Sequence, residues 1–317
     1  MSEKPGAVTE FAPMKAVLVD GPFSDPAWIF ERKLDGVRCG VIRHNGVAHL
    51  VSGTGESMDG TYPEIVEALS VDGPDVVADG EVVAFKDGQT SFERLQGRLG
   101  IHDPERARKT GIAVFLYLFD VLSVDGEGIR DRPLRERKRL LKDAVKFGGP
   151  LRFSTHRVGD GEAYFKHACE RGWEGLVAKR ADSPYKSTRS RDWLKIKCGH
   201  EQELVIGGWT DPKGSRTWFG ALLLGYWEKD RLRFAGKVGT GFNAATLERV
   251  GKELQRLEQP DPPFDERRLP RAHWVKPELV AEIAFTEWTR DGKLRHPRYL
   301  GLRDDKPARE VVRELPS

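Results

Sequence analysis

The sequence is poor in cysteine and lacks any long apolar run. It holds three cysteines in 317 residues, Cys39, Cys169 and Cys198, and they are far apart in the chain. We therefore expect buried or idle thiols, with neither a disulfide framework nor a zinc site. No apolar stretch reaches the ~20 residues of a membrane helix, and residues 1–10 lack the basic and apolar regions of a secretory signal. These absences predict a cytoplasmic protein without a membrane segment.

An excess of either charge sign is also missing. The chain carries 52 Lys and Arg against 49 Asp and Glu, so the net charge is only +3. This balance does not exclude a polyanionic partner, because the local placement of charge matters more than its sum. Basic side chains cluster at residues 130–139, 186–197 and 290–298. Each cluster is typical of either a solvated face or a nucleic-acid contact, and the sequence leaves both readings open.

The length suffices for two modest domains, and residues 15–200 mix strands with helices. The predicted extended segments are a hairpin at 41–51 that turns at Asn45-Gly46, and strands at 76–85 and 113–122. The predicted helices are 62–69, 133–147 and 162–172. Runs of strands interrupted by helices are typical of an α+β domain rather than of a regular βαβ alternation.

The texture of the sequence changes after residue 199. Short strands with glycine turns are predicted over 204–238, a proline-rich loop over 259–264, and a further strand over 280–288. One helix, 244–257, places Leu247, Val250, Leu254 and Leu257 on a single face. Short strands with one helix favour an OB-fold barrel. We therefore predict domains at 1–199 and 200–317, with a hinge near the boundary.

The segment Glu31-Arg32-Lys33-Leu34-Asp35-Gly36-Val37-Arg38 carries the first candidate chemistry. On a straight strand, Lys33, Asp35 and Val37 would share one face, whereas Gly36 would let the chain turn instead. A lysine must lose its proton to attack phosphorus, and we expect neighbouring cations, a bound metal and partial burial to lower the pKa of Lys33. The alternative is a surface ion pair at a strand end.

Four further motifs follow in order. Asp79-Gly80-Glu81 is predicted to close a strand, and Tyr117-Leu118-Phe119-Asp120 to end another with both aromatics on one face. Glu174 to Arg180 follows a helix, and Trp193 to Lys197 alternates so that Lys195 and Lys197 project together. The set combines an amine nucleophile, an aromatic ring for a base, carboxylates for a divalent ion and paired lysines for phosphates. These are the parts that nucleotidyl transfer requires.

In this order the motifs resemble the covalent nucleotidyltransferase superfamily of ATP-dependent DNA ligases and capping enzymes. The segments 207–209, 219–225, 236–242 and 294–307 resemble the ligase module of bacterial end-joining ligases, and the resemblance covers residues 15–312. It implies an α+β fold, in which a nucleotidyltransferase domain of ATP-grasp-like antiparallel sheets with helices precedes an OB-fold barrel.

The resemblance also implies roles for individual residues. AMP would be attached to Lys33, its adenine amino group would be recognised by Glu31, its base would stack on Phe119, and the nucleotide would also contact Leu34, Arg38 and Glu81. Glu174, with Asp35 and Glu81, would bind Mg2+ or Mn2+, and Lys195 and Lys197 would contact the α-phosphate. Arg303, Asp305 and Lys306 would orient pyrophosphate. Domain closure is expected, because Lys33 and Arg303 lie in different predicted domains.

The implied reaction seals a nick with a 3′-hydroxyl and a 5′-phosphate in double-stranded DNA through lysyl-AMP. The implied setting is a monomer at the bacterial nucleoid, acting beside Ku and a separate repair polymerase in end joining.

One departure from the family is Gly53, which stands where members carry an arginine that contacts the nick phosphate; Arg43 or Arg98 are candidate substitutes. The alternatives are an RNA ligase, a capping guanylyltransferase, and a non-catalytic scaffold that binds nucleic-acid ends.

Overall fold

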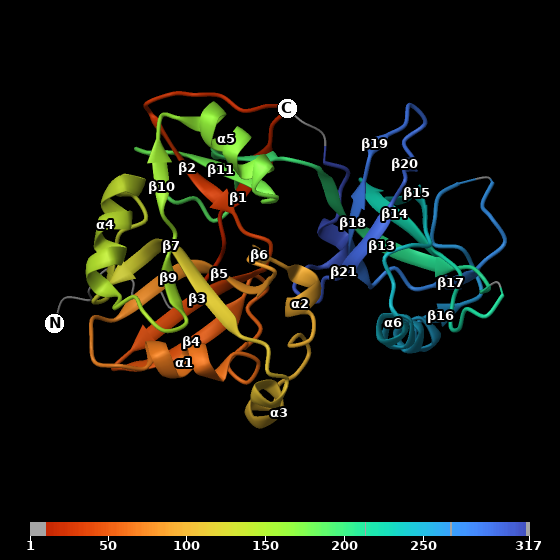
Figure 1. Ribbon diagram of the computed structural model, residues 1–317, viewed down its shortest axis with the longest axis horizontal. Helices are drawn as coiled ribbons and strands as arrows, with labels where there is room; N and C mark the ends of the chain where they lie inside the picture. Colours follow the sequence, from red (N-terminus) through yellow and green to blue (C-terminus); the bar gives the residue numbers. More distant parts are fainter. Residues whose placement is uncertain (1–10, 213, 267, 315–317) are drawn as a thin grey trace. The chain divides into compact units, whose positions relative to one another are not determined.

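The computed structural model describes residues 11–212, 214–266 and 268–314 (Figure 1). The chain divides into two compact units, and the division falls between Cys198 and Gly199. The outer ends of the two predicted domains, residues 1–10 and 315–317, lie outside the described residues. Within the described part of the chain, no helix combines the length and apolar character needed to cross a bilayer.

The first unit contains two sheets. The five-stranded sheet consists, in spatial order, of β1 (Lys15–Leu18), β12 (Arg189–Lys197), β11 (Gly175–Arg180), β2 (Trp28–Lys33) and β10 (His156–Val158). The seven-stranded sheet consists of β4 (Val47–Ser52), β3 (Val37–His44), β5 (Val76–Lys86), β7 (Val114–Val124) and β8 (Glu127–Gly128), with β6 (Gln89–Thr90) on β5 and β9 (Leu151–Phe153) on β7. Most pairs are antiparallel; β1 with β12 and β7 with β9 are parallel.

The first unit also contains helices (Figure 1). They are α1 (Pro63–Leu69), α2 (Phe92–Leu95), α3 (Pro104–Lys109), α4 (Leu134–Ala144) and α5 (Gly161–Glu170). Helix α4 packs on β7 and α1 on β4, while α5 packs on β11 and β2. The three predicted helices are confirmed, with α4 shorter than the predicted range. The predicted hairpin is confirmed too: Asn45 and Gly46 have φ of 49° and 77°, as a two-residue turn requires.

The strands predicted over 76–85 and 113–122 are confirmed as β5 and β7, but the two motifs expected to end strands do not end them. Asp79-Gly80-Glu81 lies in the middle of β5, and Tyr117 to Asp120 lies inside β7. Both strands continue because β5 is paired on both sides, with β3 and with β7, and its later residues Val82 and Ala84 are buried in the core. The β5–β7 register shifts at Asp79/Gly80. Such a bulge re-aims side chains without ending a strand.

The packing of the five-stranded sheet decides which face is left for chemistry. Phe30, Leu176 and Ile196 all belong to one apolar cluster, which also contains residues of α5. Since side chains alternate along a strand, their neighbours Glu31, Lys33, Val177, Lys195 and Lys197 project from the opposite face. Residues of β2 and of β11 and β12, which come much later in the sequence, therefore share one side of this sheet.

The second unit is built on a seven-stranded sheet with one helix. Its strands are β15 (Arg231–Val238), β14 (Leu222–Glu228), β13 (His200–Trp209), β17 (His273–Val275) and β16 (Glu258–Gln259), with β18 (Val280–Phe285) between β13 and β21 (Arg298–Leu302). The remaining elements are β19 (Glu287–Trp288) paired with β20 (Leu294–Arg295), α6 (Ala244–Arg256) and the 3-10 turn η1 (Ala308–Glu310).

Helix α6 confirms the predicted amphipathic pattern. Val250, Leu254 and Leu257 are buried in the core of the second unit, and Leu247 packs against it. The helix begins after Asn243, whose side chain accepts a hydrogen bond from the backbone N–H of Thr246. The strand predicted over 280–288 is instead split in two: β18 pairs with β13 and β21, whereas β19 pairs with β20. A change of pairing partner near Thr286 accounts for the break.

Candidate active site

Lys33 is the last residue of β2, and the chain turns directly after it. Leu34 to Gly36 belong to no strand, and β3 begins at Val37. A Cβ atom at Gly36 would lie 2.2 Å from the carbonyl oxygen of Val82, so only glycine fits there. Asp35 accepts a hydrogen bond from the backbone N–H of Phe92, at the start of α2, at 3.1 Å. The expected turn is therefore confirmed, and the alternative of one straight strand is wrong.

The amine of Lys33 forms an ion pair with Glu174. The distances from Lys33 Nζ to the two carboxylate oxygens are 2.5 and 2.6 Å. Both side chains are mostly buried, with 20% and 10% of their surface exposed, so this is not the surface ion pair considered as an alternative. Glu174 comes to this position because Gly175, the first residue of β11, pairs with Lys33 on one side and Lys197 on the other.

The expected lowering of the Lys33 pKa is wrong for this arrangement. Burial opposes a charge on Lys33, but the Glu174 carboxylate outweighs burial, and the pKa of Lys33 lies above its ordinary value. The pKa of Glu174 is lowered despite its burial, since Lys33 and Lys197 favour its charged form. The resting pair is thus an ammonium and a carboxylate, and a neutral amine on Lys33 requires that Glu174 be engaged elsewhere.

The two lysines of β12 project together, as predicted. Lys197 Nζ lies 3.6 Å from Glu174, and Lys195 is close enough to lower the pKa of that carboxyl. Leu194 and Ile196, which alternate with the lysines, belong to the apolar cluster beneath the sheet. Three amines thus surround one carboxylate, leaving an excess of positive charge that suits a polyphosphate.

Arg38 is held by Asp79. Its guanidinium donates two hydrogen bonds to the Asp79 carboxylate, which also accepts one from the Tyr185 hydroxyl at 2.7 Å. Asp79 is fully buried, and burial raises the pKa of its carboxyl although Arg38 opposes the shift. Glu81 is the residue opposite Arg38 in the β3–β5 register. The implied contacts of Arg38 and Glu81 to nucleotide stay predictions.

Phe119 is 7% exposed and packs edge to face against Trp193, with ring centroids 5.9 Å apart. Two cations lie over its ring: the Lys179 ammonium at 4.2 Å and the Arg38 guanidinium at 4.8 Å from the centroid. The predicted aromatic surface is therefore already in contact with protein cations. Stacking of a base on Phe119 stays a prediction, and so does any contact of Leu34 with the nucleotide.

Glu31 has partners that the motifs did not indicate. Its carboxylate accepts hydrogen bonds from Lys138 Nζ at 2.7 Å, Lys179 Nζ at 3.0 Å and the Ser154 hydroxyl at 2.9 Å. Burial raises the pKa of Glu31, but the two lysines outweigh it and the net shift is downward. The helical spacing of α4 could have indicated that Lys138 faces the core, because it lies four residues after the buried Leu134 and three before the buried Leu141.

The three predicted metal ligands do not form a cage. Asp35 bonds to the backbone of Phe92, and Glu174 is paired with Lys33 and Lys197. Among the residues described here, no group of three or more His, Cys, Asp or Glu side chains is placed to hold a metal ion. Mg2+ usually binds to one or two carboxylates together with substrate phosphates and water. Glu174 fits that mode, since it lies beside Lys195 and Lys197, for which phosphate contacts are predicted.

The residues predicted to orient pyrophosphate lie in the second unit. Arg303 donates two hydrogen bonds to Asp305, both at 2.9 Å, and lies 3.5 Å from Glu282. These carboxylates raise the pKa of Arg303 well above its ordinary value although burial opposes the shift. Lys306 Nζ lies 2.7 Å from Glu203. The unit therefore holds the basic residues of this segment in internal ion pairs.

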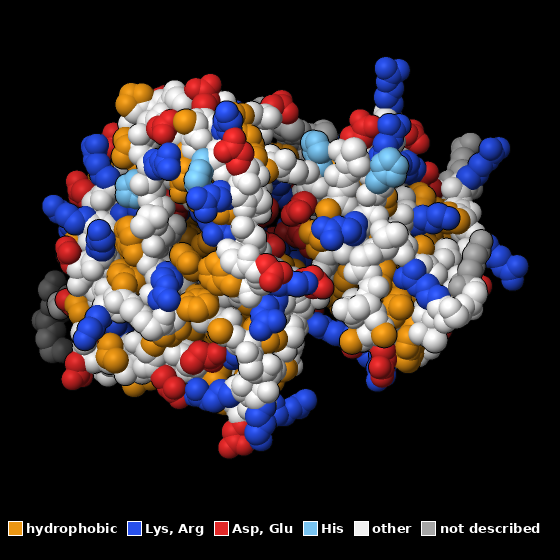
Figure 2. All heavy atoms as spheres, viewed as in Figure 1, with side chains coloured by type: hydrophobic (Ala, Val, Ile, Leu, Met, Phe, Trp, Pro, Cys, Tyr) orange, Lys and Arg blue, Asp and Glu red, His pale blue; other side chains and the backbone are white. Residues whose placement is uncertain are grey.

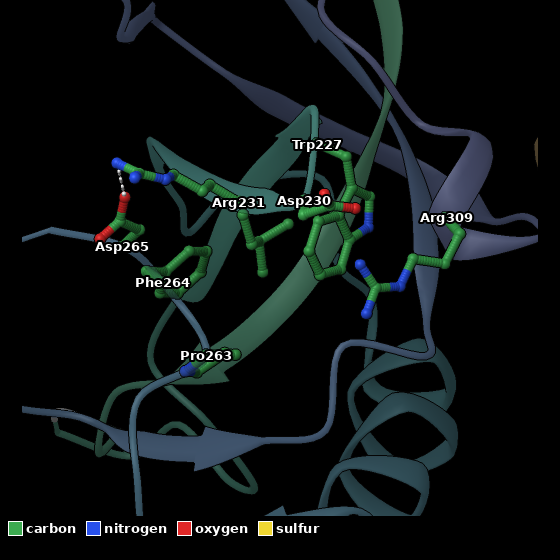
Figure 3. A pocket seen from close by; sticks show the side chains of 8 residues that line it. Trp227, Asp230, Arg231, Pro263, Phe264, Asp265 and Arg309 are labelled. Atoms are coloured by element: carbon green, nitrogen blue, oxygen red, sulfur yellow. Dashed lines mark hydrogen bonds and ion pairs between the residues drawn. The ribbon is translucent and has the colours of Figure 1, made fainter.

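A pocket of about 500 Å³ lies elsewhere in the second unit (Figure 3). The Arg309 guanidinium lies over Trp227, 3.7 Å from the ring centroid, and Arg231 pairs with Asp265 at 3.2 Å. None of the predicted site residues lines this pocket.

Neither candidate substitute for the missing arginine is available to DNA. Arg98 is 1% exposed and donates to Glu64 and to the carbonyl oxygens of Thr61 and Ile112. Arg43 is 3% exposed and donates to the carbonyl oxygens of Pro74 and Ala144. Both guanidinium groups stabilise the interior of the first unit, so the expectation that either replaces the arginine at position 53 is wrong.

The basic clusters are mixed with acidic side chains. In the first cluster Arg137 pairs with the buried Asp120, and Lys138 with Glu31. In the second cluster Lys186 pairs with Asp192, and in the third Arg295 pairs with Glu287. On the face drawn in Figure 2, Lys and Arg side chains are interspersed with Asp and Glu on each unit. Part of the first cluster thus serves internal packing.

The cysteines differ from the prediction. Cys169 at the end of α5 and Cys198 after β12 form a disulfide, with Cα atoms 5.4 Å apart. The expectation of idle thiols was wrong because the two residues, 29 positions apart, meet where α5 packs on the sheet. Cys198 also donates its backbone N–H to the carbonyl oxygen of Glu174. Cys39 is a buried free thiol, and burial raises its pKa.

The chain is similar to known ATP-dependent DNA ligases over both of its units. The profile of the ATP dependent DNA ligase domain matches residues 13–197, and that of the ATP dependent DNA ligase C terminal region matches residues 215–306. The chain is 38% identical to a multifunctional non-homologous end joining protein LigD of Pseudomonas aeruginosa, covering 96% of this chain and 37% of that protein. It is 33% identical to a DNA ligase of Thermococcus fumicolans, covering 89% of this chain and 53% of that protein.

Among solved structures, a mycobacterial DNA ligase D complexed with ATP and MES is similar to this chain, with a TM-score of 0.68 and 35% identity. That similarity covers 96% of this chain and 98% of the other. It confirms the predicted α+β fold, a nucleotidyltransferase domain followed by an OB-fold domain. The chain spans about two fifths of the length of the LigD proteins it matches.

Proposed function

We propose how this chain acts from one premise: it belongs to the family of ATP-dependent DNA ligases. Its function is to seal nicks that carry a 3′-hydroxyl and a 5′-phosphate, through an AMP group held covalently on Lys33. The observation that supports this most directly is the buried position of Lys33 Nζ, 2.5 Å from Glu174 and on the same sheet face as Lys195 and Lys197.

In the first step, the neutral amine of Lys33 attacks the α-phosphorus of ATP. A bond forms between Nζ and phosphorus, and the bond from phosphorus to the bridging oxygen of pyrophosphate breaks. The amine is protonated while it pairs with Glu174. Once Glu174 turns away from it, burial and the nearby Lys197 both favour the neutral form, because each opposes a positive charge on Lys33.

Lys195 and Lys197 stabilise the negative charge that develops on the α-phosphate. Glu174 would hold a Mg2+ or Mn2+ ion together with phosphate oxygens, and that ion would neutralise charge on the triphosphate. Arg303 and Lys306 of the second unit orient the pyrophosphate. AMP then passes from Lys33 to the 5′-phosphate of the nick, and the 3′-hydroxyl displaces AMP as the new phosphodiester bond forms.

The biological setting is proposed from the relatives. Several are named as non-homologous end joining proteins, so we place this chain in the repair of double-strand breaks. Its partners there are nicked or broken double-stranded DNA, Ku and a separate repair polymerase, and it acts as a monomer at the bacterial nucleoid. Because DNA contacts release counterions, its affinity for DNA falls steeply as salt concentration rises.

The test combines intact-mass measurement with a sealing gel. Incubation with ATP and Mg2+ should add one AMP to the protein, and subsequent nicked DNA should remove it and be sealed. The Lys33→Ala variant should gain no mass, whereas Lys186→Ala should gain mass as the unaltered protein does, because Lys186 is half exposed and its ion-pair partner among the described residues is Asp192. An adduct that persists in Lys33→Ala would refute the assignment of the nucleophile.

The same experiment distinguishes the alternatives. A capping guanylyltransferase would form its adduct from GTP, and an RNA ligase would seal nicked RNA in preference to nicked DNA. A scaffold that only binds nucleic-acid ends would gain no mass from either nucleotide.

A further inference from the structure

Glu31 lies at the centre of a buried polar cluster contributed by four separate elements. It belongs to β2, Lys138 to α4 and Lys179 to β11, and Ser154 follows β9. Glu31, Lys138 and Lys179 are each only 2–3% exposed, and Ser154 is 4% exposed. Two cations for one anion leave the cluster with a net positive charge. Burying such charges is costly, and apolar side chains of similar size would serve stability as well or better.

The hydrogen bonds to Glu31 are unevenly distributed over its two oxygens. Oε2 accepts from both Lys179 Nζ and Ser154 Oγ, at 3.0 and 2.9 Å, whereas Oε1 accepts, within the described part of the chain, only from Lys138 Nζ, at 2.7 Å. A carboxylate oxygen can accept about two hydrogen bonds. Three of the four acceptor positions are thus filled by the protein, and one position on Oε1 is left for another donor.

The alternation of side chains along β2 places the open acceptor position of Glu31 beside Lys33. Glu31 and Lys33 are two residues apart on β2, so their side chains project from the same face about 6–7 Å apart along the strand. Phe30 between them points into the apolar cluster on the other face. A nucleotide attached to Lys33 therefore extends over the face that carries Glu31.

We propose that Lys138, Lys179 and Ser154 are positioning residues for nucleotide specificity, which hold Glu31 as an ionised acceptor for the 6-amino group of a purine. This inference rests on the proposed function, since it concerns the nucleotide that reaches Lys33. An ionised carboxylate accepts hydrogen bonds and cannot donate one. A 6-amino purine offers Oε1 a donor, whereas a 6-oxo purine places a second acceptor against Oε1, so that the purine oxygen and the open position of Oε1 face each other without a hydrogen bond in a buried site.

Lys138 is the decisive member because it is the sole donor to Oε1 among the described residues. Replacing it with Met keeps most of the volume but removes that donor and one of the two cations. Glu31 then takes up a proton more readily and can donate to a 6-oxo group. The variant should therefore discriminate less against 6-oxo purines, and its discrimination should fall further as pH decreases.

The experiment measures binding of ATP and of inosine triphosphate by calorimetry, in the full chain carrying Lys33→Ala so that no covalent transfer occurs. We expect the reference protein to prefer ATP by about 10- to 100-fold, the range for one buried acceptor left unpaired. Adding Lys138→Met should reduce the preference about tenfold and make it fall further at lower pH, because a carboxyl that has lost one of its cations takes up a proton more readily.

Two controls keep the inference separate from effects on folding. Lys142→Met alters an exposed lysine one turn further along α4 and should leave the preference unchanged. Ser154→Ala removes an uncharged donor from Oε2 and should lower the preference less than Lys138→Met does.

Each outcome has a defined meaning. If the reference protein binds no ATP, the proposed function itself fails. If ATP binds but Lys138→Met weakens ATP and inosine triphosphate equally, or changes neither, the lysines serve only structure and the inference is overturned.

Discussion

Loss of the Cys169–Cys198 disulfide should destabilise the first unit by a predictable amount. The bond closes a loop of 29 residues, and the chain-entropy relation for such a loop gives about 3.6 kcal/mol of stabilisation at 25 °C. That is a large share of the 5–15 kcal/mol that holds a typical domain together. The same loop contains β11, β12 and Glu174, so the site described above lies within the stabilised segment.

Hydrogen exchange followed by mass spectrometry is the appropriate assay, because it reports on the first unit separately from the second. In the slowest-exchanging peptides of β5 and β7, reduction of the disulfide should lower protection by about 400-fold, the equivalent of 3.6 kcal/mol. The variant with Cys169→Ser and Cys198→Ser should show the lower protection at once, and reductant should not change it further.

Two results would refute the reasoning. The first is equal protection in oxidised and reduced protein, which would mean that the cross-link constrains nothing that unfolding releases. The second is alkylation of three thiols in denatured protein that was never reduced, where the disulfide leaves only Cys39 to react.

Three further predictions concern other residues. Arg303→Ala should slow adenylation by ATP at least tenfold more than sealing of pre-adenylated nicked DNA, measured in parallel assays; an equal loss in both would assign this residue another role. Gly53→Arg should strengthen binding to nicked DNA several-fold in a gel-shift assay, since a Cβ there meets only Pro13 at 3.7 Å and the candidate substitutes Arg43 and Arg98 are both buried; unchanged affinity would contradict this. Burial lowers the pKa of Lys179 to about 8, so between pH 8 and about 10.5 the unfolded chain binds more protons at this lysine than the folded chain does. The free energy of unfolding of the unaltered protein should therefore rise with pH in this range relative to that of Lys179→Met, as measured by denaturant titration. Parallel pH profiles of the two proteins would contradict this.

The local elements were predictable where each depends on a short stretch of sequence. Asn45-Gly46 produced the expected turn because both residues tolerate positive φ. The face of α6 that carries Val250 and Leu254 is buried as its period indicates. Alternation along β12 was enough to place Lys195 and Lys197 together.

Predictions failed where a strand or a charge depends on partners distant in the sequence. The motifs Asp79-Gly80-Glu81 and Tyr117 to Asp120 were expected to end their strands, but both strands continue past them because β5 is paired with β3 and with β7. The pKa of Lys33 was expected to fall, but the sheet brings Glu174, 141 positions away, to its amine. Arg43 and Arg98 were treated as available, although both guanidinium groups are buried.

The order of chemical groups along the chain is sufficient to indicate nucleotidyl transfer, because an amine, an aromatic ring, carboxylates and paired lysines keep their identity whatever surrounds them. Their protonation and their partners are a different matter, since these depend on burial and on Coulomb interactions over a few ångströms. Lys138 and Lys179 lie 107 and 148 positions from Glu31 in the sequence and bond to it in the fold. Cys169, at the end of α5, meets Cys198 because that helix packs on the sheet. Only the folded sheets bring such groups within that range.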